Sequence, residues 1–412
     1  MHILFLTHYF PPEVNAPASR TFECAKVWAA RGHKVTIVTP APSHPGGIVY
    51  PGYRNRWTSR EQVDGIDVIR IWTFVAANKG FAKRTLGFLS YPLSLLLHMW
   101  RLPKADIVVS SSPQFFAGLG GRLLKRRHRP WVLEIRDLYP ESIVAVGAMK
   151  RGLGIRLLEK LERGAYRSAD GIVSVTDSFV PHIAERRGRD DIAVIKNGVD
   201  LSFFTADGAG EAAKLLRRSL GLEGKFVAAY VGTHGAAHGL DTILDAADLL
   251  RGDDRFAFLL VGDGSERERL AAAVRARGLE NVLLLGQRPK ADMPVIWAAA
   301  DVGLVLLKRS DTFKAVLPSK MFEIMGMARP IILGVEGEAA ALLENAGAGV
   351  AITPESAAEL AGRVSELADD PERVRRLGEA GRRYVAEQFD RTRLAERYAD
   401  FLLETVRRRR RG

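Results

Sequence analysis

Runs of apolar residues alternate along the chain with segments of helical periodicity. In the first half the apolar runs begin at residues 2, 34, 67, 106, 130, 171 and 192, and most of them are continuously apolar. Such runs are typical of strands in a parallel sheet that is buried on both faces. The segments between them predict helices, for instance over residues 19–31, which end before Gly32, a residue suited to a helix terminus. The pattern therefore predicts an α/β fold.

The alternation starts again in the second half, where apolar runs begin at residues 225, 256, 281, 301, 329 and 349. Two successive units of this kind predict two Rossmann-like domains with parallel sheets. We expect the first domain to span residues 1–205 and the second 206–390, because Ala, Asp and Gly dominate near 205–210. A last helix over 391–412, with an arginine-rich tail, is expected to pack back toward the first domain.

Charge and cysteine content narrow the classes of partner. The 412 residues include 60 Lys and Arg against 48 Asp and Glu, which gives a formal net charge of +12. Such an excess favours nucleic acid, phosphorylated small molecules or an acidic membrane surface. Nucleic acid is disfavoured, because the basic residues lack interleaved aromatic residues and no recognition module is present. The single cysteine, Cys24, excludes an intrachain disulfide and fits a cytoplasmic protein, and the amino-terminal run does not resemble a signal peptide.

Residues 86–100 form a strongly apolar segment with basic residues on both sides. Lys83 and Arg84 precede it, and Arg101 and Lys104 follow it. The segment is shorter than the roughly 20 residues that span a bilayer, and Pro92 interrupts it. It is either a helix in the membrane interface, with its flanks on anionic headgroups, or a core helix of the first domain. The sequence favours neither interpretation.

Ligands of open parallel sheets bind beyond the carboxyl ends of the strands, so the residues that follow each strand are the candidate site. After the first strand of the second domain, a glycine-rich turn contains Gly232, Thr233, His234 and His238. Backbone N–H groups at such a turn suit a diphosphate, and the histidines could add donors. The alternative is a plain strand-to-helix turn.

The next two strand ends give weaker signals. Gly262 and Gly264 would let a ligand approach the backbone closely. Gln287 and Arg288 could border a nucleobase, although Arg288 is equally well explained as a solvated surface charge.

The strongest cluster in the second domain lies at a helix start near Pro318. Ser319 and Glu323 are four residues apart and share one face of that helix, with Lys320 beside them. Lys320 could meet a phosphate, and Glu323 could accept hydrogen bonds from a ribose hydroxyl pair. The alternative is a solvated capping arrangement.

In the first domain, Arg136 and Asp137 end the fifth apolar run. An acid and a base at a strand end suit contacts with an acceptor or a leaving group, and a structural ion pair explains them equally well. Asn15, in the loop after the first strand, could line the acceptor side of a cleft.

Several common kinds of chemistry have no signature in the sequence. No G-x-G-x-x-G follows the first strand, and no P-loop, G-x-S-x-G or zinc-ligand spacing is found. No acidic metal pair is apparent either, so we expect no metal and no cofactor. Catalysis would then rest on positioning and on fixed charge at a leaving diphosphate.

Taken together, these residues resemble glycosyltransferase family 4, the large retaining group of GT-B architecture. The resemblance covers nearly the whole chain and includes FPPE at 10–13, NGVD at 197–200, VGDG at 261–264 and SKMFEIMGMARPII at 319–332. EIRDLYPESIVAVG at 134–147 and VGTHGAAHGLDT at 231–242 are similar to the L-fucosamine-type transferases of O-antigen and colanic acid synthesis. The resemblance implies two domains that face each other across a cleft and retention of configuration by front-face attack.

The chain departs from the family's pattern at three places. The usual pair of glutamates, eight residues apart, falls on Ala315 and Glu323, so the first glutamate is missing. The usual Arg and Lys of the turn after residue 231 are absent, and Arg136 stands where a histidine is often found. We interpret these changes as variation within a subfamily rather than as loss of activity.

The expected function is metal-independent transfer of a sugar from a nucleotide diphosphate sugar to a lipid-linked or saccharide acceptor. The donor is expected to be UDP-linked, with an N-acetylated deoxy sugar as one candidate. The enzyme would act peripherally at the inner face of the cell membrane in bacterial surface polysaccharide synthesis. The alternatives are a nucleotide-sugar epimerase of the same fold and a non-catalytic scaffold of a polysaccharide assembly complex.

Overall fold

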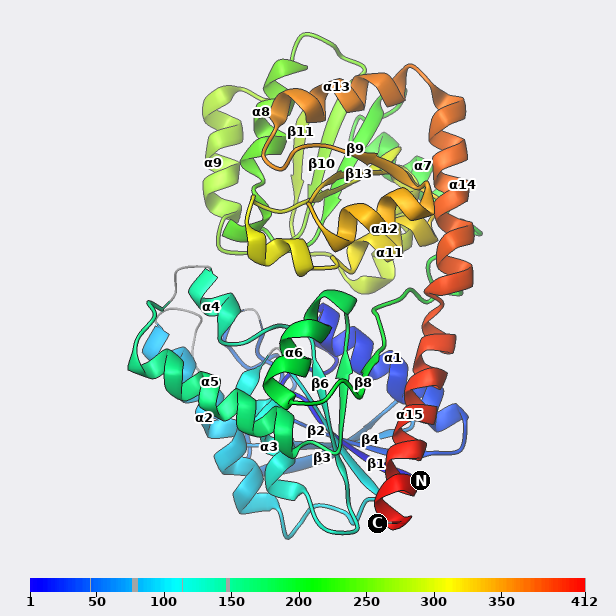
Figure 1. Ribbon diagram of the computed structural model, residues 1–412. Helices are drawn as coiled ribbons and strands as arrows, with labels where there is room; N and C mark the ends of the chain where they lie inside the picture. Colours follow the sequence, from blue (N-terminus) through cyan, green and yellow to red (C-terminus); the bar gives the residue numbers. More distant parts are fainter. Residues whose placement is uncertain (45, 76–80, 113, 146–148, 412) are drawn as a thin grey trace. The chain divides into compact units, whose positions relative to one another are not determined.

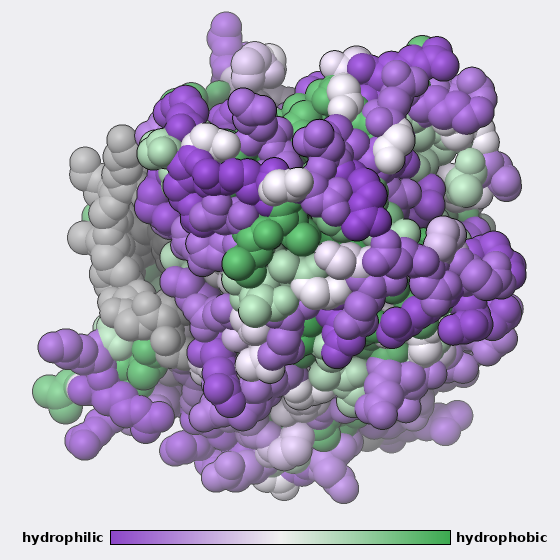
Figure 2. All heavy atoms as spheres, turned by 90° about the horizontal axis from the view of Figure 1, so that it is seen from above, coloured by the Kyte–Doolittle hydropathy of each residue, from purple (hydrophilic) through white to green (hydrophobic). Residues whose placement is uncertain are grey.

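The computed structural model describes residues 1–44, 46–75, 81–112, 114–145 and 149–411. The chain divides into two compact units (Figure 1). Unit 1 comprises Met1–Lys196 and Arg391–Gly412, and unit 2 comprises Asn197–Asp390. On the face drawn in Figure 2, hydrophilic residues predominate and apolar residues occur in small groups. Among the described residues, the buried apolar side chains form three core clusters, one in unit 1 and two in unit 2.

Unit 1 is built on an eight-stranded sheet of the described residues, in the order β3-β4-β2-β1-β5-β6-β7-β8. Its strands are β1 (His2–Leu6), β2 (Lys34–Thr39), β3 (Thr58–Val63), β4 (Ile66–Ile71), β5 (Ile107–Ser111), β6 (Trp131–Ile135), β7 (Gly171–Ser174) and β8 (Ile192–Val194). Its helices are α1 (Ala16–Ala30), α2 (Phe81–His98), α3 (Phe115–Leu124), α4 (Glu141–Ala145), α5 (Leu153–Ser168), α6 (Val180–Arg187) and α15 (Arg391–Arg411), with a 3-10 turn at Asp177–Phe179.

Unit 2 has a six-stranded parallel sheet in the order β11-β10-β9-β12-β13-β14. Its strands are β9 (Phe226–Val231), β10 (Phe256–Val261), β11 (Val282–Leu285), β12 (Val302–Leu306), β13 (Ile331–Gly334) and β14 (Gly349–Ala351). Its helices are α7 (Gly210–Ser219), α8 (Asp241–Leu249), α9 (Arg267–Arg277), α10 (Met293–Ala299), α11 (Lys320–Gly326), α12 (Glu338–Ala346), α13 (Ala357–Ala368) and α14 (Pro371–Gln388). Short 3-10 turns lie at Ala236–His238, Lys290–Asp292 and Asp311–Ala315.

The carboxy-terminal helix α15 belongs to unit 1, where it lies beside α1 (Figure 1). The Trp28 indole of α1 donates to the Ala395 carbonyl at 2.8 Å, and its ring meets Tyr398 edge to face at 5.2 Å. Leu394, Leu402 and Trp28 belong to one buried core. Apolar burial of this kind is the main source of stability, and it fixes the last helix on the first unit.

Three features differ from the sequence-based expectations. The boundary lies between Lys196 and Asn197 rather than at 205, because Val199 and Phe204 are buried in the core of unit 2. The strand β3 was not anticipated; it pairs antiparallel with β4 at the sheet edge, so the sheet is not wholly parallel. The helix α2 continues through Pro92 instead of being interrupted there.

Candidate active site

Two loops at the carboxyl ends of β9 and β10 are joined by backbone hydrogen bonds. The Gly232 amide donates to the Val261 carbonyl, and the His234 amide donates to the Asp263 carbonyl, both at 2.9 Å. A Cβ atom on Gly262 would lie 1.9 Å from the Gly232 carbonyl oxygen, and one on Gly264 would lie 2.5 Å from that of His234. The φ angles of +143° and +156° at these positions also favour glycine. The glycines of both motifs thus permit one continuous loop surface.

The side chain of Lys320 reaches this loop surface from the start of α11. Its ammonium lies 3.6 Å from the centroid of the Tyr230 ring, and a Cβ atom on Gly232 would come within 2.8 Å of it. The ammonium is buried and has no hydrogen-bond acceptor among the described residues. Burial lowers the pKa of Lys320 to about 7, although nearby Glu323 partly opposes that shift. An ammonium group held in this way can bind an anion.

The two histidines of the turn lie beside the lysine. His234 is fully buried, and neither of its ring nitrogens has a partner among the described residues. The same holds for Nδ1 of His238. Burial lowers the pKa of both imidazoles to about 4, so at neutral pH both are uncharged and carry one N–H each. His238 already makes a hydrogen bond with the Leu306 backbone, whereas the N–H of His234 is available to a ligand. Unsatisfied buried groups are costly, and several together indicate a polar ligand.

The other candidate residues of unit 2 lie around the cluster of Lys320 and the two histidines. Ser319 precedes α11 without a side-chain capping bond, and Glu323 is half-buried one turn into the helix. Ala315 ends the 3-10 turn before α11, so no carboxylate stands at that position. Thr233 lies within the joined loops, and its carbonyl accepts from the Tyr230 hydroxyl at 2.8 Å.

Gln287 and Arg288 are exposed beyond β11, and no contact of either with Lys320 or the histidines is seen in the described part of the chain.

Two residues of the cluster were not predicted from the sequence. Tyr230 lies in an apolar run and was not proposed as a site residue, although a tyrosine next to the end of a buried strand needs a hydrogen-bond partner. Arg267 begins α9, lies near Gly286 and is close enough to His234 to lower its pKa, after the larger effect of burial.

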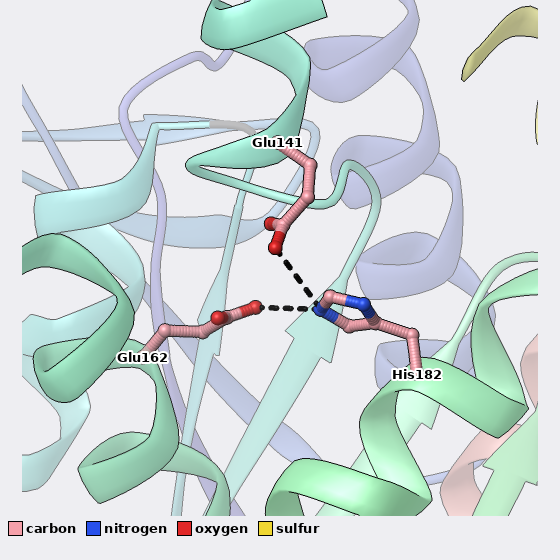
Figure 3. Close-up of side chains that lie close together, drawn as sticks. All are labelled: Glu141, Glu162 and His182. Carbon is pink, nitrogen blue, oxygen red and sulfur yellow. Dashed lines mark hydrogen bonds and ion pairs between the residues drawn. The ribbon is translucent and has the colours of Figure 1, made fainter. Parts of the chain in front are cut away.

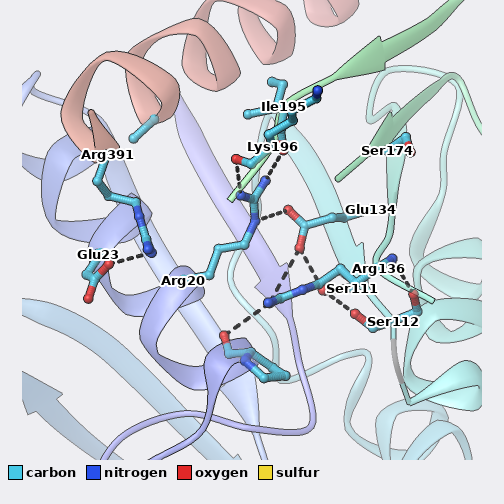
Figure 4. A network of polar contacts seen from close by, with 12 residues as sticks. Arg20, Glu23, Ser111, Ser112, Glu134, Arg136, Ser174, Ile195, Lys196 and Arg391 are labelled. Atoms are coloured by element: carbon cyan, nitrogen blue, oxygen red, sulfur yellow. Dashed lines mark hydrogen bonds and ion pairs between the residues drawn. The ribbon is translucent and has the colours of Figure 1, made fainter. Parts of the chain in front are cut away.

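In unit 1, Arg136 belongs to a buried polar network at the end of β6 (Figure 4). Glu134 accepts from Nε of Arg20 at 3.2 Å and from the Ser111 hydroxyl at 2.8 Å, and it lies 4.0 Å from Arg136. The Arg136 side chain is only 6% exposed, and it donates to the Pro17 carbonyl at 3.4 Å. Burial lowers the pKa of Arg136 to about 10, against the opposing effect of Glu134. The network fixes the strand end, which supports the structural interpretation of this residue.

Asp137 and Asn15 also lie at this edge of the first sheet. Burial raises the pKa of Asp137, and the residue lines a small, mostly apolar pocket together with Phe115, Tyr139 and Tyr166. Asn15 is the N-cap of α1 and accepts from the Ala18 amide at 2.9 Å. Its Nδ2 is buried without an acceptor among the described residues.

A second group at this edge was not anticipated. His8 follows β1, and its ring lies 5.1 Å from that of Tyr9, which is 5.2 Å from the ring of His44. Nδ1 of each histidine is buried without a partner in the described structure. Glu13 accepts from the amides of Ser43 and His44 at 2.9 Å and so joins the loops after β1 and β2. The positions of His8 and His44 after strands could have indicated this group from the sequence.

One cluster of possible metal ligands occurs among the described residues, formed by Glu141, Glu162 and His182 (Figure 3). Nε2 of His182 lies 3.1 Å from Glu162 and 3.9 Å from Glu141. The guanidinium of Arg186 donates to both carboxylates. One of the two negative charges of this cluster is therefore balanced by Arg186, and the cluster ties α5 to α6.

Comparison with known families identifies the class of protein. Residues 15–198 match the family described as Glycosyl transferase 4-like domain, and residues 213–384 match the one described as Glycosyl transferases group 1. The chain therefore has two Rossmann-like units, and it matches two glycosyltransferase family domains, one in each half. It belongs to the GT-B glycosyltransferases. The expected family and fold class are confirmed.

Individual relatives place the chain more closely. It is 28% identical to the colanic acid biosynthesis glycosyl transferase WcaI of Escherichia coli K12, over 86% of this chain and 89% of that protein. It is 28% identical to the glycosyltransferase WbjE of Pseudomonas aeruginosa, over 58% of this chain and 60% of that protein.

Solved structures share the fold across both units. Sucrose-phosphate synthase from Thermosynechococcus elongatus superimposes with a TM-score of 0.75 at 18% identity, and 98% of each chain is covered. HepE of Anabaena, solved with UDP and glucose, gives a TM-score of 0.72 at 19% identity over 97% of this chain and 98% of that one. At such identities the likeness concerns the fold.

Proposed function

We propose that the protein transfers a sugar, with retention of configuration and without a metal ion, from a UDP-linked donor to a lipid-linked or saccharide acceptor of bacterial surface polysaccharide synthesis. The observation that carries the proposal is the group of unpartnered buried donors around the joined loops of unit 2. Lys320 and His234 offer an ammonium and an imidazole N–H where a diphosphate would meet glycine backbone. The names of WcaI and of HepE in complex with UDP support the pathway and the nucleotide.

The chemistry assigned to these groups is stabilisation of the leaving diphosphate. Negative charge grows on the phosphate oxygen as the glycosidic bond to the donor breaks. A preorganised cation and neutral N–H donors in a site shielded from water stabilise that charge more in the transition state than in the ground state. Glu323 would hold the ribose, and Asp137 and Asn15 would contact the acceptor.

A thermal-shift panel tests the donor site. Wild-type protein and Glu323→Ala are heated with UDP, GDP, ADP or CDP, each with Mg²⁺ and with EDTA. We expect a selective shift by UDP that does not depend on the metal and is lost in the variant. The exposed Glu223→Ala serves as a control that should keep the shift. A thermal shift that requires Mg²⁺ would contradict the proposed metal independence. If no nucleotide shifts the melting temperature, the alternative of a non-catalytic scaffold is favoured.

Product analysis tests the reaction. Incubation of a UDP-sugar without acceptor should leave the sugar unchanged, since an epimerase would convert it. With membrane extract as acceptor, NMR of the product should show the anomeric configuration of the donor. The opposite configuration would rule out retention. The proposal also has the enzyme act peripherally at the inner membrane face, and the exposed leucines of α2 support that part.

A further inference from the structure

The helix α2 exposes five leucines on its outer face. Leu86, Leu89, Leu93, Leu96 and Leu97 recur at helical spacing and are 43–57% exposed, and Trp100, just beyond the helix, is 86% exposed. Among the described residues, no helix is long and apolar enough to cross a membrane. An apolar stripe of this length on a helix of a folded domain indicates a contact surface.

The inner face of α2 combines two buried apolar side chains, Tyr91 and Leu95, with polar ones. Ser90, Ser94 and His98 are buried against the rest of unit 1. The Ser90 hydroxyl donates to the Gly87 carbonyl at 2.6 Å and accepts from the Phe74 amide at 2.8 Å, while Nδ1 of His98 lies 2.7 Å from the Ser94 carbonyl. The register of the helix is therefore fixed by these contacts, and rotation could not bury the leucines without exposing or orphaning polar groups.

The helix α5 repeats this arrangement. Leu153, Leu157 and Leu161 are spaced four residues apart and are 82%, 59% and 37% exposed. The carboxylate of Glu162 on the same helix is instead buried and points toward His182 of α6 (Figure 3). Between them, α3 contacts both α2 and α5 and exposes Leu123. We call the exposed leucines of these three helices the leucine face.

Basic residues are interspersed with the leucine face. Arg156, Lys160 and Arg163 are exposed on α5 between its leucines, and no carboxylate of the described residues lies within ion-pair distance of them. Exposed Arg101 and Lys104 follow α2, and exposed Arg126 and Arg127 follow α3. The side chains of Lys83 and Arg84, also expected to flank this surface, lie outside the described residues. Cations beside leucines and a tryptophan are typical of surfaces that lie in the interface of an anionic bilayer.

The charge also argues against a second copy of the chain as the occupant. A two-fold contact through the leucine face would bring the same cations of both copies together, and like charges across an interface are unfavourable. Anionic headgroups would complement them instead, and the leucines and Trp100 could then enter the boundary of the acyl region.

We propose that the leucine face of α2, α3 and α5 docks unit 1 onto the surface of an anionic lipid bilayer. The inference extends the membrane part of the proposed function from one segment to a surface of three helices. It rests on the geometry of unit 1 alone and needs no donor. Failure to bind UDP would therefore leave it standing, and failure to bind lipid would leave the donor site standing.

Vesicle flotation of the full chain tests the proposal. The vesicles contain phosphatidylcholine alone or with roughly one third phosphatidylglycerol, at about 0.15 M and about 0.5 M NaCl. Wild-type protein should float with the anionic vesicles at the lower salt concentration. The double variant Leu93→Glu, Leu157→Glu and the triple variant Arg156→Glu, Lys160→Glu, Arg163→Glu should each partition at least tenfold more weakly.

The control replaces leucines of similar exposure in unit 2. Leu215 and Leu249 are 62% and 63% exposed, and the double variant Leu215→Glu, Leu249→Glu should float like the wild type. Circular dichroism and thermal denaturation without ligand establish that every variant is folded. The proposal would be overturned if the wild-type protein does not float with anionic vesicles. It would also be overturned if the variants of the leucine face or of its basic residues float like the control. A wild-type dimer that Leu93→Glu dissociates, without vesicle binding, would assign the face to a second copy.

Discussion

Lys320 holds its ammonium 3.6 Å from the centroid of the Tyr230 ring, where the negative face of the aromatic system compensates part of its charge. The ammonium has no oxygen acceptor among the described residues. A cation–π contact is weaker than an ion pair, and it leaves the N–H groups of Lys320 without a hydrogen-bond acceptor. In the free protein, burial of the Lys320 ammonium therefore costs electrostatic free energy, and an anionic ligand would reduce that cost.

The first prediction concerns the balance between stability and binding. Lys320→Met should raise the free energy of unfolding of the unliganded protein by about 1–3 kcal/mol, because a buried, unpaired charge is removed. The same variant should lose most of its affinity for UDP, at least about tenfold, because the phosphate loses a charged donor. Thermal denaturation and titration calorimetry measure the two effects.

Lys214→Met is the matched control, because Lys214 is exposed in the same unit and pairs with Glu211 across 2.7 Å. It should change neither quantity appreciably. A variant at Lys320 that is destabilised without ligand would contradict the description of this lysine as an unsatisfied cation.

The second prediction concerns pH. The pKa of Lys320 is lowered to about 7, so in the free protein the amine loses its charge as the pH rises above 7. A bound diphosphate favours the ammonium, so binding takes up a proton there, and UDP affinity should fall by up to about tenfold per pH unit from 7 to 8.5. The phosphate, with a pKa near about 6, is already ionised in that range.

Calorimetry in two buffers of different ionisation enthalpy measures the proton uptake. His234 and His238, with pKa values lowered to about 4, stay neutral in this range and should not contribute. In Lys320→Met the uptake should vanish. Proton uptake that persists in the variant would assign it to another group.

The third prediction concerns the joined loops. In Gly262→Ala, the new Cβ would meet the Gly232 carbonyl oxygen at 1.9 Å in a backbone conformation that only glycine adopts readily. We expect a loss of about 3 kcal/mol or more in the stability of unit 2, together with loss of the UDP shift. Gly252→Ala has open space around it and should stay within about 0.5 kcal/mol of wild type in denaturant unfolding. Equal behaviour of the two variants would refute the steric argument.

The strands that could be predicted from the sequence are those buried on both faces, because continuous apolar runs such as that ending at Val261 have no other simple explanation. The strand β3 alternates exposed and half-buried residues at a sheet edge, and its sequence TSREQV carries no apolar run to indicate it. The outward register of α2 could not be predicted either, since periodicity does not reveal which face is inside when serines are buried.

The candidate site could be predicted where chemistry and strand ends coincide. Lys320 and His234 were both proposed from their positions after strands or at a helix start, and the structure brings them to one loop surface. Tyr230 could not be assigned this role, because its ring approaches Lys320 only through the packing of α11 against the sheet. For Arg136, the sequence left a structural role open, and the network around Glu134 favours that role.

The last prediction concerns Glu134, whose carboxylate faces Arg20 and Arg136 in the interior of unit 1. Burial alone would raise its pKa, but the two guanidinium groups hold the pKa below its ordinary value. Glu134→Gln leaves both arginines uncompensated and should cost about 3–5 kcal/mol of stability near neutral pH.

The sign of the pH dependence follows from the lowered pKa of Glu134. Its stabilisation is complete above the unfolded-state pKa, near about 4.3, and is lost as the pH falls through the lower folded-state value. The difference in unfolding free energy between wild type and Glu134→Gln should therefore be constant from pH 6 to 8 and shrink below about pH 4. In Glu223→Gln, the lost partner is an exposed arginine 3.0 Å away, so the cost should stay below about 0.5 kcal/mol. Urea unfolding of both variants measures this contrast, and a cost at Glu134 no larger than that at Glu223 would show that the buried network is not what fixes the end of β6.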